Sequence, residues 1–210
     1  MKHPSVLLAL AVQSLSAVSC QHHESARLDE ALVQVLEQIG ASDQEYRNMM
    51  DSVVTAYGWD SKEVKELWVK QDAADSINLM RIREIIDRYG YPGTSLVGDQ
   101  NRVAWLVIQH ADLATQEEYL PLLHEAAKEG ELPRSAYALL IDRVRMRRGE
   151  KQLYGSQIRI EEGTPVVYPI EDEPNVNRRR AEVGLGPIEE YVRQFGIEYK
   201  LPDETPDDRE

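Results

Sequence analysis

The chain has 210 residues, of which 42% are hydrophobic, and its 37 acidic and 24 basic residues give a formal net charge of −13. A chain of this length and hydrophobic content is sufficient for one domain with a packed core. The acidic excess argues against nucleic-acid binding, because neutralising phosphates requires clustered Lys and Arg side chains. We therefore expect no nucleic acid among the partners of this protein.

Residues 1–19 have the pattern of an export signal peptide. Lys2 precedes an apolar run at residues 6–12, which is too short to span a membrane, and small residues then lead to Cys20. The segment resembles a bacterial lipobox, with Ala17 where Leu is usual. This resemblance implies that Cys20 is lipidated and anchors the protein to a membrane of the bacterial cell envelope, on the periplasmic or surface side. Simple secretion and an uncleaved or chance segment are the alternatives.

Helical periodicity begins after a linker at residues 20–24. Apolar spacing in residues 25–75 predicts one helix that ends at Gly40, a second that starts at Ser42, and a third that is capped by Asp60. Cys20 is the only cysteine, so no disulfide forms within one chain.

Residues 76–197 have the pattern of a helical core domain. Helical spacing and end signals predict six further helices, over residues 76–89, 99–113, 115–130, 133–148, 177–183 and 187–195. Residues 157–161 and 164–168 predict a short β-hairpin, and the acidic segment 198–210 is predicted to be a disordered tail. The fold class is therefore mostly α, a single helical domain with one small β-hairpin.

Three predicted helices each carry one polar side chain within an apolar stripe, namely Asn78, His110 and Arg143. We expect all three to point inward. A buried guanidinium requires a partner, and for Arg143 the internal candidates are Glu171 and Asp172. If one of these carboxylates neutralises Arg143, the arginine is structural. If neither does, Arg143 is expected to bind a ligand carboxylate or phosphate.

His110 is the candidate general acid or base, and the alternative is a neutral core histidine. His110 and Asp112 lie two residues apart on a predicted helix and project in nearly opposite directions, so together they cannot chelate one ion unless the helix is broken. We expect no metal site and no cofactor.

A polar turn near residue 155 offers further binding candidates. Tyr154 and Gln157 are expected at the rim of the pocket, since binding side chains concentrate in loops. The alternative is that Gly155 makes the turn while Gln157 caps backbone groups. Arg179, or its neighbour Arg180, is expected to reach the same rim.

Six blocks of sequence occur in one order along the chain. They are Tyr89–Pro92, Ala104–Asp112, Asp142–Val144, Gln152–Gln157, Pro169–Asp172 and Asn177–Leu185. Together they resemble a bacterial domain-of-unknown-function family, number 6624, over about residues 76–195. The chain departs from the family at Tyr91, where members usually have Trp. The resemblance implies no established activity and assigns no catalytic residue.

These observations favour a bacterial envelope lipoprotein with an inward polar pocket that binds a small anionic or peptide-like ligand. Hydrolysis, with His110 as acid or base, is an additional activity that the residues leave open. The alternative is a non-enzymatic structural or interaction protein of the envelope, in which the buried polar network only fixes the packing of the helices.

Overall fold

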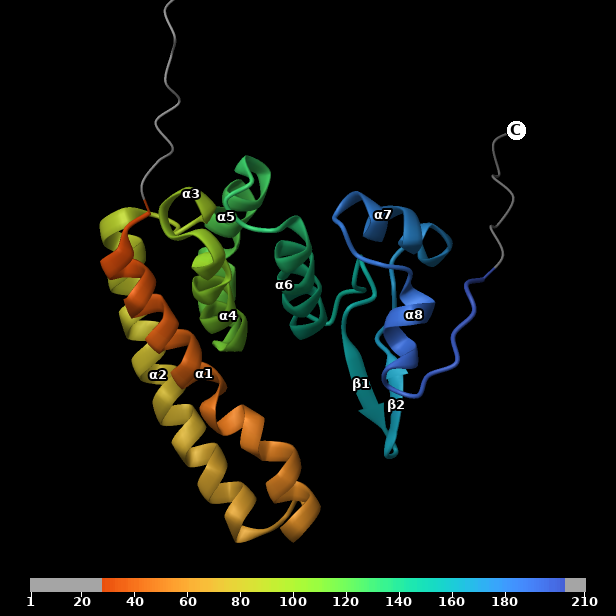
Figure 1. Ribbon diagram of the computed structural model, residues 1–210. Coiled ribbons are helices and arrows are strands. Elements are labelled where there is room, and N and C mark those ends of the chain that lie inside the picture. Colours follow the sequence, from red (N-terminus) through yellow and green to blue (C-terminus); the bar gives the residue numbers. More distant parts are fainter. Residues whose placement is uncertain (1–27, 203–210) are drawn as a thin grey trace, which may run out of the picture.

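The structure is a computed structural model, and it describes residues 28–202. The expected signal peptide, the linker with Cys20, and most of the acidic tail lie outside the described residues. The helices are α1 (Glu30–Tyr57), α2 (Lys62–Tyr89), α3 (Thr94–Val97), α4 (Val103–His110), α5 (Leu113–Glu129), α6 (Arg134–Arg147), α7 (Val176–Glu182) and α8 (Ile188–Arg193). Two short 3-10 helices, Gly98–Arg102 and Glu173–Asn175, and the strands β1 (Ile158–Glu161) and β2 (Thr164–Val167) complete the fold (Figure 1). The predicted fold class is confirmed.

Helices α1 and α2 form a long helical hairpin at one side of the molecule (Figure 1). The predicted helix end at Gly40 is wrong, because α1 continues through this residue. A glycine inside a helix costs only about 1 kcal/mol, and burial of the surrounding apolar side chains outweighs that cost. The expected boundary between residues 75 and 76 falls inside the continuous helix α2, which begins after its N-cap Ser61 rather than after Asp60.

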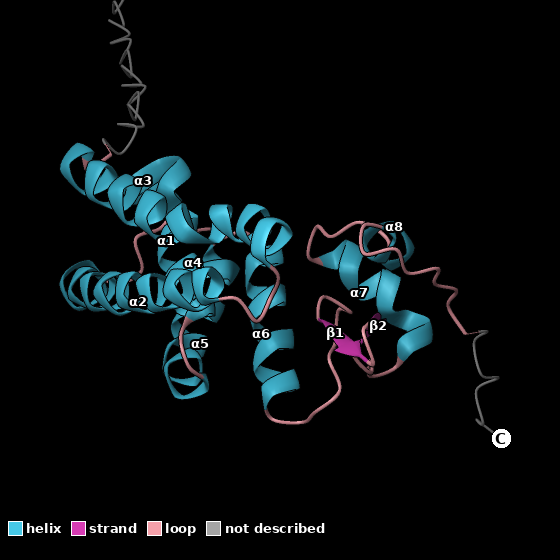
Figure 2. Ribbon diagram, turned by 90° about the horizontal axis from the view of Figure 1, so that it is seen from below, coloured by secondary structure: helices cyan, strands magenta, loops and turns pink. Residues whose placement is uncertain are grey.

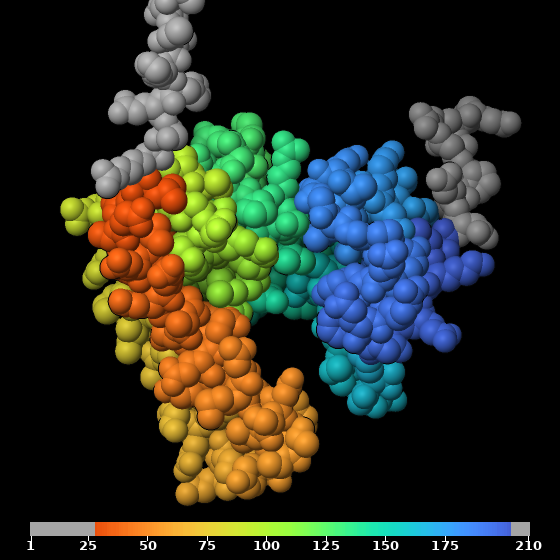
Figure 3. Space-filling model, in the orientation of Figure 1, coloured from red at the N-terminus to blue at the C-terminus, as the bar shows by residue number. Residues whose placement is uncertain are grey.

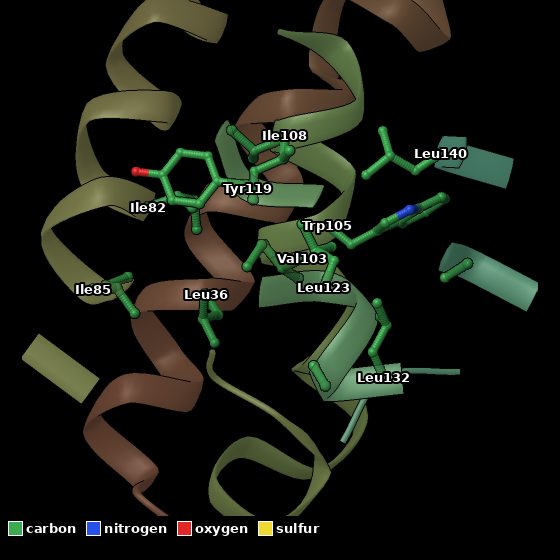
Figure 4. Packing of buried hydrophobic residues seen from close by; sticks show 14 of the residues in the cluster. Leu36, Ile82, Ile85, Val103, Trp105, Ile108, Tyr119, Leu123, Leu132 and Leu140 are labelled. Carbon is green, nitrogen blue, oxygen red and sulfur yellow. The ribbon is translucent and has the colours of Figure 1, made fainter. Parts of the chain in front are cut away.

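The main core lies where α4, α5 and α6 pack against the upper part of this hairpin (Figure 4). Among its fully buried members are Leu36, Ile82, Ile108, Leu123 and Leu140. Helix α4 is short and buried on most of its surface, so it occupies the centre of the helical part. Polar groups at the end of α4 are thereby brought against α1, α2, α5 and α6.

The connections around α4 differ from the prediction. The helix expected over residues 99–113 is divided into a 3-10 helix and α4, and α4 ends at His110. Asp112 then caps α5 by accepting a hydrogen bond from the Thr115 amide at 2.8 Å, so α5 begins two residues before the predicted start at residue 115. Because Asp112 needs an extended backbone for this role, α4 stops before it.

The carboxy-terminal part packs around the predicted hairpin, which is confirmed. Strands β1 and β2 are antiparallel, with Ile158 opposite Val167 and Glu161 opposite Thr164. Figure 2 shows this hairpin in magenta, on the same side of the molecule as α7 and α8. Helices α7 and α8 cover this hairpin and enclose a second, smaller apolar cluster. Its buried members are Ile170, Val176, Ile188 and Val192.

The space-filling view shows a hollow between the far end of the α1–α2 hairpin and the unit formed by β1, β2 and α8 (Figure 3). The carboxyl ends of α4 and α6 point towards this hollow (Figure 1). Within residues 28–202, no helix combines the length and apolar character that crossing a bilayer requires.

Candidate functional site

His110 lies at the end of α4 and contacts a buried carboxylate of α1. Its Nδ1 atom is 3.1 Å from Oδ1 of Asp43. The Asp43 side chain has no exposed surface, whereas 19% of the His110 side chain is exposed. We did not predict Asp43, although it continues the buried stripe of Leu36 and Ile39 at helical spacing. The false helix end at Gly40 concealed this pattern.

Three neighbouring side chains from α1 and α2 hold Asp43 in place, and with it they form the α1–α2 polar cluster: Asp43, Arg47, Gln71 and Asp75. Arg47 donates two hydrogen bonds to the Asp75 carboxylate, at 2.9 and 2.7 Å, and its Nη1 atom is 3.4 Å from Asp43 Oδ2. Gln71 Nε2 donates to the Asp43 carbonyl at 3.2 Å and to Asp75 Oδ1 at 2.7 Å. A two-bond Arg–carboxylate pair fixes orientation as well as distance, so the cluster is rigid.

Asn78 is buried, as predicted, but it contacts neither His110 nor Arg143 by a hydrogen bond within the described chain. Its Nδ2 atom lies 3.4 Å from Ser42 Oγ, and 1% of the residue is exposed. Its Oδ1 atom is buried and has no hydrogen-bond partner among residues 28–202. The structure therefore places Asn78 beside Ser42, which precedes Asp43 in the chain, and Asp43 in turn contacts the His110 imidazole.

A pocket of about 330 Å³ opens beside His110, between α2 and the end of α4. We call it the α2–α4 pocket, and its lining residues are Asp72, Asp75, Ser76, Leu79, Val107, His110, Ala111 and Asp112. Its volume matches the lower end of the range for small-molecule sites. Asp43 thus contacts the His110 ring on its buried side, and the exposed side of His110 lines the α2–α4 pocket.

Arg143 lies on α6, and its hydrogen-bond partners within residues 28–202 are uncharged groups. Its Nη1 atom donates to the carbonyl of Gln109 at 3.0 Å, and its Nε atom lies 3.3 Å from Gln157 Oε1. The expected partners bind elsewhere, since Glu171 pairs with Arg145 and Asp172 pairs with Arg179. Neither candidate carboxylate therefore neutralises Arg143, which corresponds to the second of the two alternatives left open by the sequence.

The electrostatic environment of Arg143 is unfavourable for its charge. Burial lowers the pKa of the Arg143 guanidinium, and the positive charges of Arg147 and Arg47 lower it further. The polar hydroxyl group of Tyr191 opposes this effect in part. A group with this environment gains stability from an added negative charge.

The loop that presents Gln157 is organised by Asp142, to which we had assigned no function from the sequence. The buried Asp142 carboxylate accepts hydrogen bonds from the amides of Leu153, Tyr154 and Ser156 and from Ser156 Oγ, at 2.7 to 3.1 Å. Burial raises the pKa of Asp142, and these hydrogen bonds counteract that rise. Asp142 is therefore a structural anchor for the loop.

The remaining predicted residues have different positions. Gln157 is buried and, besides Arg143, contacts Ser156 Oγ at 3.0 Å. Tyr154 is half-buried, and burial raises the pKa of its hydroxyl, with the charge of Asp142 adding to the rise. Arg179 donates to the Leu153 carbonyl at 2.9 Å and to Asp172, so it ties the loop to α7. Arg180, rather than Arg179, is the buried member of its arginine run.

Comparison with known proteins adds a family but no activity. The chain matches a family of unknown function, DUF6624, over residues 18–202.

The chain belongs to the DUF6624 family. The match extends the resemblance seen from residue 76 onwards to α1 and α2, so Asp43 and Arg47 lie within the region that defines the family. No curated protein and no solved structure gives a significant match to the chain.

In this DUF6624 protein, Asn78 contacts Ser42, His110 contacts Asp43, and Arg143 contacts Gln109 and Gln157. Ser42 and Asp43 are neighbours in the chain, as are Gln109 and His110, but no hydrogen bond among the described residues joins Asn78, His110 and Arg143 directly. Among the described residues, no group of three or more His, Cys, Asp or Glu side chains is placed to hold a metal ion. The arrangement offers a positive charge and a supported imidazole, which can bind an anion and transfer a proton.

Proposed function

We propose that this DUF6624 protein binds a small anionic or peptide-like ligand beside Arg143 and His110. The observation that carries this proposal is the environment of Arg143, whose hydrogen-bond partners in the described chain are a carbonyl and an amide oxygen. A largely buried arginine without a carboxylate is costly, and a ligand carboxylate or phosphate would offset that cost by charge-assisted hydrogen bonds.

The surroundings of Arg143 support an anion rather than a neutral ligand. Arg147 and Arg47 lie close enough to lower the pKa of Arg143, so positive charge accumulates at this point of an otherwise acidic protein. Arg47 is already paired with Asp75, whereas Arg143 and Arg147 have no carboxylate partner among the described residues, and Arg147 donates to the Ala111 carbonyl at 2.7 Å. Local positive potential raises the concentration of anions at the site.

His110 gives the site a group that can transfer protons. It adjoins Gln109, the residue whose carbonyl binds Arg143, and it lines the α2–α4 pocket. Arg143 is not among the residues that line this pocket, so a ligand held by Arg143 would have to extend past Gln109 to reach the imidazole. For a ligand of that length, the imidazole supports hydrolysis as the reaction of the site.

A sharp test uses Arg143→Met and Arg143→Lys, with glutarate and inorganic phosphate as probes. We expect wild-type protein to show probe-dependent NMR shifts at Gln157 and His110. Arg143→Met should lower the affinity by about 10-fold to 100-fold, because a hydrogen bond to a charged group contributes about 1.5 to 3 kcal/mol, and Lys should restore part of it. Arg148→Met, which removes an exposed arginine of the same region, is the matched control.

The alternative is that the polar network is purely structural and only fixes helix packing. It is favoured by the network around Asp142, which serves the loop alone. If wild-type protein binds neither probe and Arg143→Met loses several kcal/mol of unfolding free energy, the structural function replaces the binding function.

We further propose that the protein is a bacterial envelope lipoprotein, anchored to a membrane through lipidated Cys20. The lipobox-like pattern supports this, and it lies outside the described residues. Two or more acyl chains on one cysteine would hold the protein firmly, since each buried methylene contributes about 0.8 kcal/mol.

Replacing Cys20 by Ser tests the anchor. We expect Cys20→Ser to move the protein from the membrane fraction to the soluble fraction and to abolish incorporation of a labelled fatty acid. Ser19→Ala is the control, because it changes a neighbouring small residue and keeps the thiol. An unchanged distribution of Cys20→Ser between the fractions would contradict lipidation.

A further inference from the structure

The contact between Asp43 and His110 fixes which nitrogen of the imidazole carries the proton. Asp43 Oδ2 already accepts a hydrogen bond from Gln44 Nε2 at 2.6 Å and lies 3.4 Å from Arg47 Nη1. The carboxylate thus acts as an acceptor towards its neighbours. The 3.1 Å contact of its other oxygen with Nδ1 is a hydrogen bond when Nδ1 carries the hydrogen.

This tautomer determines whether the imidazole nitrogen on the side of the α2–α4 pocket carries a hydrogen or a lone pair. In a neutral imidazole with hydrogen on Nδ1, the lone pair is on Nε2. Nδ1 faces the fully buried Asp43, so Nε2, at the opposite side of the ring, is the nitrogen that remains for the α2–α4 pocket. No described residue forms a hydrogen bond with Nε2.

We propose that Asp43 is a positioning residue that keeps neutral His110 in the Nδ1–H tautomer, so that Nε2 acts as the general base of a hydrolytic site. This inference rests on the proposed function, and it names the substrate class of that site as an acyl compound that carries a carboxylate. The carboxylate is bound by Arg143, which contacts the Gln109 carbonyl and lies outside the residues that line the α2–α4 pocket, and the ester or amide carbonyl extends towards His110.

The step balances with water as the only other reactant. The water oxygen forms a bond to the acyl carbon while one of its protons passes to Nε2. The bond from the acyl carbon to the leaving oxygen or nitrogen then breaks, and the proton on Nε2 passes to that leaving atom. Asp43 keeps its hydrogen bond to Nδ1–H throughout and stabilises the imidazolium that forms in between.

The α1–α2 polar cluster explains why Asp43 can hold this position. Its backbone carbonyl accepts hydrogen bonds from Arg47 and Gln71, and Arg47 is itself fixed by Asp75. The carboxylate is therefore oriented before His110 contacts it. Such support of a histidine by a second group commonly changes activity by about 10-fold to 100-fold.

The first experiment determines the tautomer by nitrogen-15 NMR of the histidine rings in full-length protein. We expect wild-type His110 to be protonated at Nδ1 in its neutral form, and Asp43→Asn to lose this preference. His124, which is exposed and lies beside Glu125, is the internal control. A wild-type His110 with its hydrogen on Nε2 would overturn the proposal, and this measurement requires no variant to fold.

The second experiment measures hydrolysis of 4-nitrophenyl hydrogen glutarate, an ester with a free carboxylate, against the neutral 4-nitrophenyl butyrate. We expect preferential hydrolysis of the anionic ester, a loss of about 10-fold or more in Asp43→Asn, and loss to background in His110→Gln. Asp51→Asn is the matched control, since Asp51 is exposed on the same helix. Absence of hydrolysis by wild-type protein would overturn the assignment of His110 as a base.

The two proposals fail in different ways. Arg143→Met should weaken glutarate binding and leave the tautomer of His110 unchanged. Asp43→Asn should change the tautomer and leave glutarate binding within about 2-fold. Binding that persists beside a wrong tautomer refutes the general base alone, and absence of binding refutes the site.

Discussion

Asp142 shows how one residue can determine the shape of a functional loop. The Asp142 carboxylate has no exposed surface and accepts hydrogen bonds from three successive parts of the loop that carries Gln157. Loss of one carboxylate oxygen of Asp142 as a hydrogen-bond acceptor would leave several buried amide hydrogens of the loop without a partner. Each such loss is costly, because buried donors cannot turn to water instead.

We therefore expect Asp142→Asn to lower the free energy of unfolding by about 2 to 4 kcal/mol. The measurement is chemical denaturation followed by circular dichroism. Asp87→Asn, an exposed position on α2, is the control and should change stability by less than about 0.5 kcal/mol. Equal effects of the two substitutions would contradict an anchoring function for Asp142.

At the scale of residues, helical periodicity predicted which side chains point inward, but not which residues they contact. Asn78 is buried, and His110 and Arg143 are half-buried on inward faces. Their contacts were not predictable, because Asp43 lies 67 positions from His110 and Gln109 lies 34 positions from Arg143. Such pairings depend on how helices approach each other, which no local pattern encodes.

At the scale of elements, the sequence did not distinguish a glycine inside a helix from a glycine that a turn requires. Gly40 lies inside α1, where a Cβ atom would meet Val103 at an ordinary contact distance of 3.4 Å. Gly155 has φ of +65°, and a Cβ atom there would overlap Ile188 and lie 3.0 Å from Ile170 Cδ1. Gly40 is therefore replaceable, and Gly155 is required by its turn.

The same substitution should thus have opposite effects at the two positions. We expect Gly40→Ala to raise the free energy of unfolding by up to about 1 kcal/mol, because alanine favours the helix interior. Gly155→Ala should lower it by about 2 to 4 kcal/mol, through left-handed backbone strain and overpacking. Thermal and chemical denaturation of the two variants side by side would check both signs. Destabilisation by Gly40→Ala would show that Val103 cannot accommodate the methyl group.

The predicted elements after residue 130 were accurate, because each has a clear signal at both ends. Pro133 precedes α6, and the hairpin turns at Glu162–Gly163 between two short runs of strand-forming residues. The errors were confined to α1, α2 and the approach to α4. There, tertiary packing extended helices through a glycine or ended them at an alternative cap.

At the scale of the whole molecule, stability is distributed unevenly along the α1–α2 hairpin. Its upper part packs into the main core, while its far end is held by a small cluster whose buried members are Met50, Val64 and Leu67. Trp59 and Trp68 lie exposed near this end. Few buried apolar contacts imply a low free energy of local opening.

Hydrogen exchange measured by mass spectrometry should detect this difference. We expect backbone amides of residues 50–57 and 62–67 to exchange faster than those of α4, which is buried at the centre of the core. Comparable protection of both segments would indicate that the far end of the hairpin is as stable as the core.

This weak end of the hairpin forms one side of the hollow in Figure 3. Since it can bend or fray while the packed centre keeps its shape, the width of the hollow can adjust to molecules of different size. His110 and Arg143 lie on helices anchored in that centre, so their positions stay fixed when the far end of the hairpin moves. Under the binding function proposed above, one rigid pair of chemical groups could then accept several related ligands.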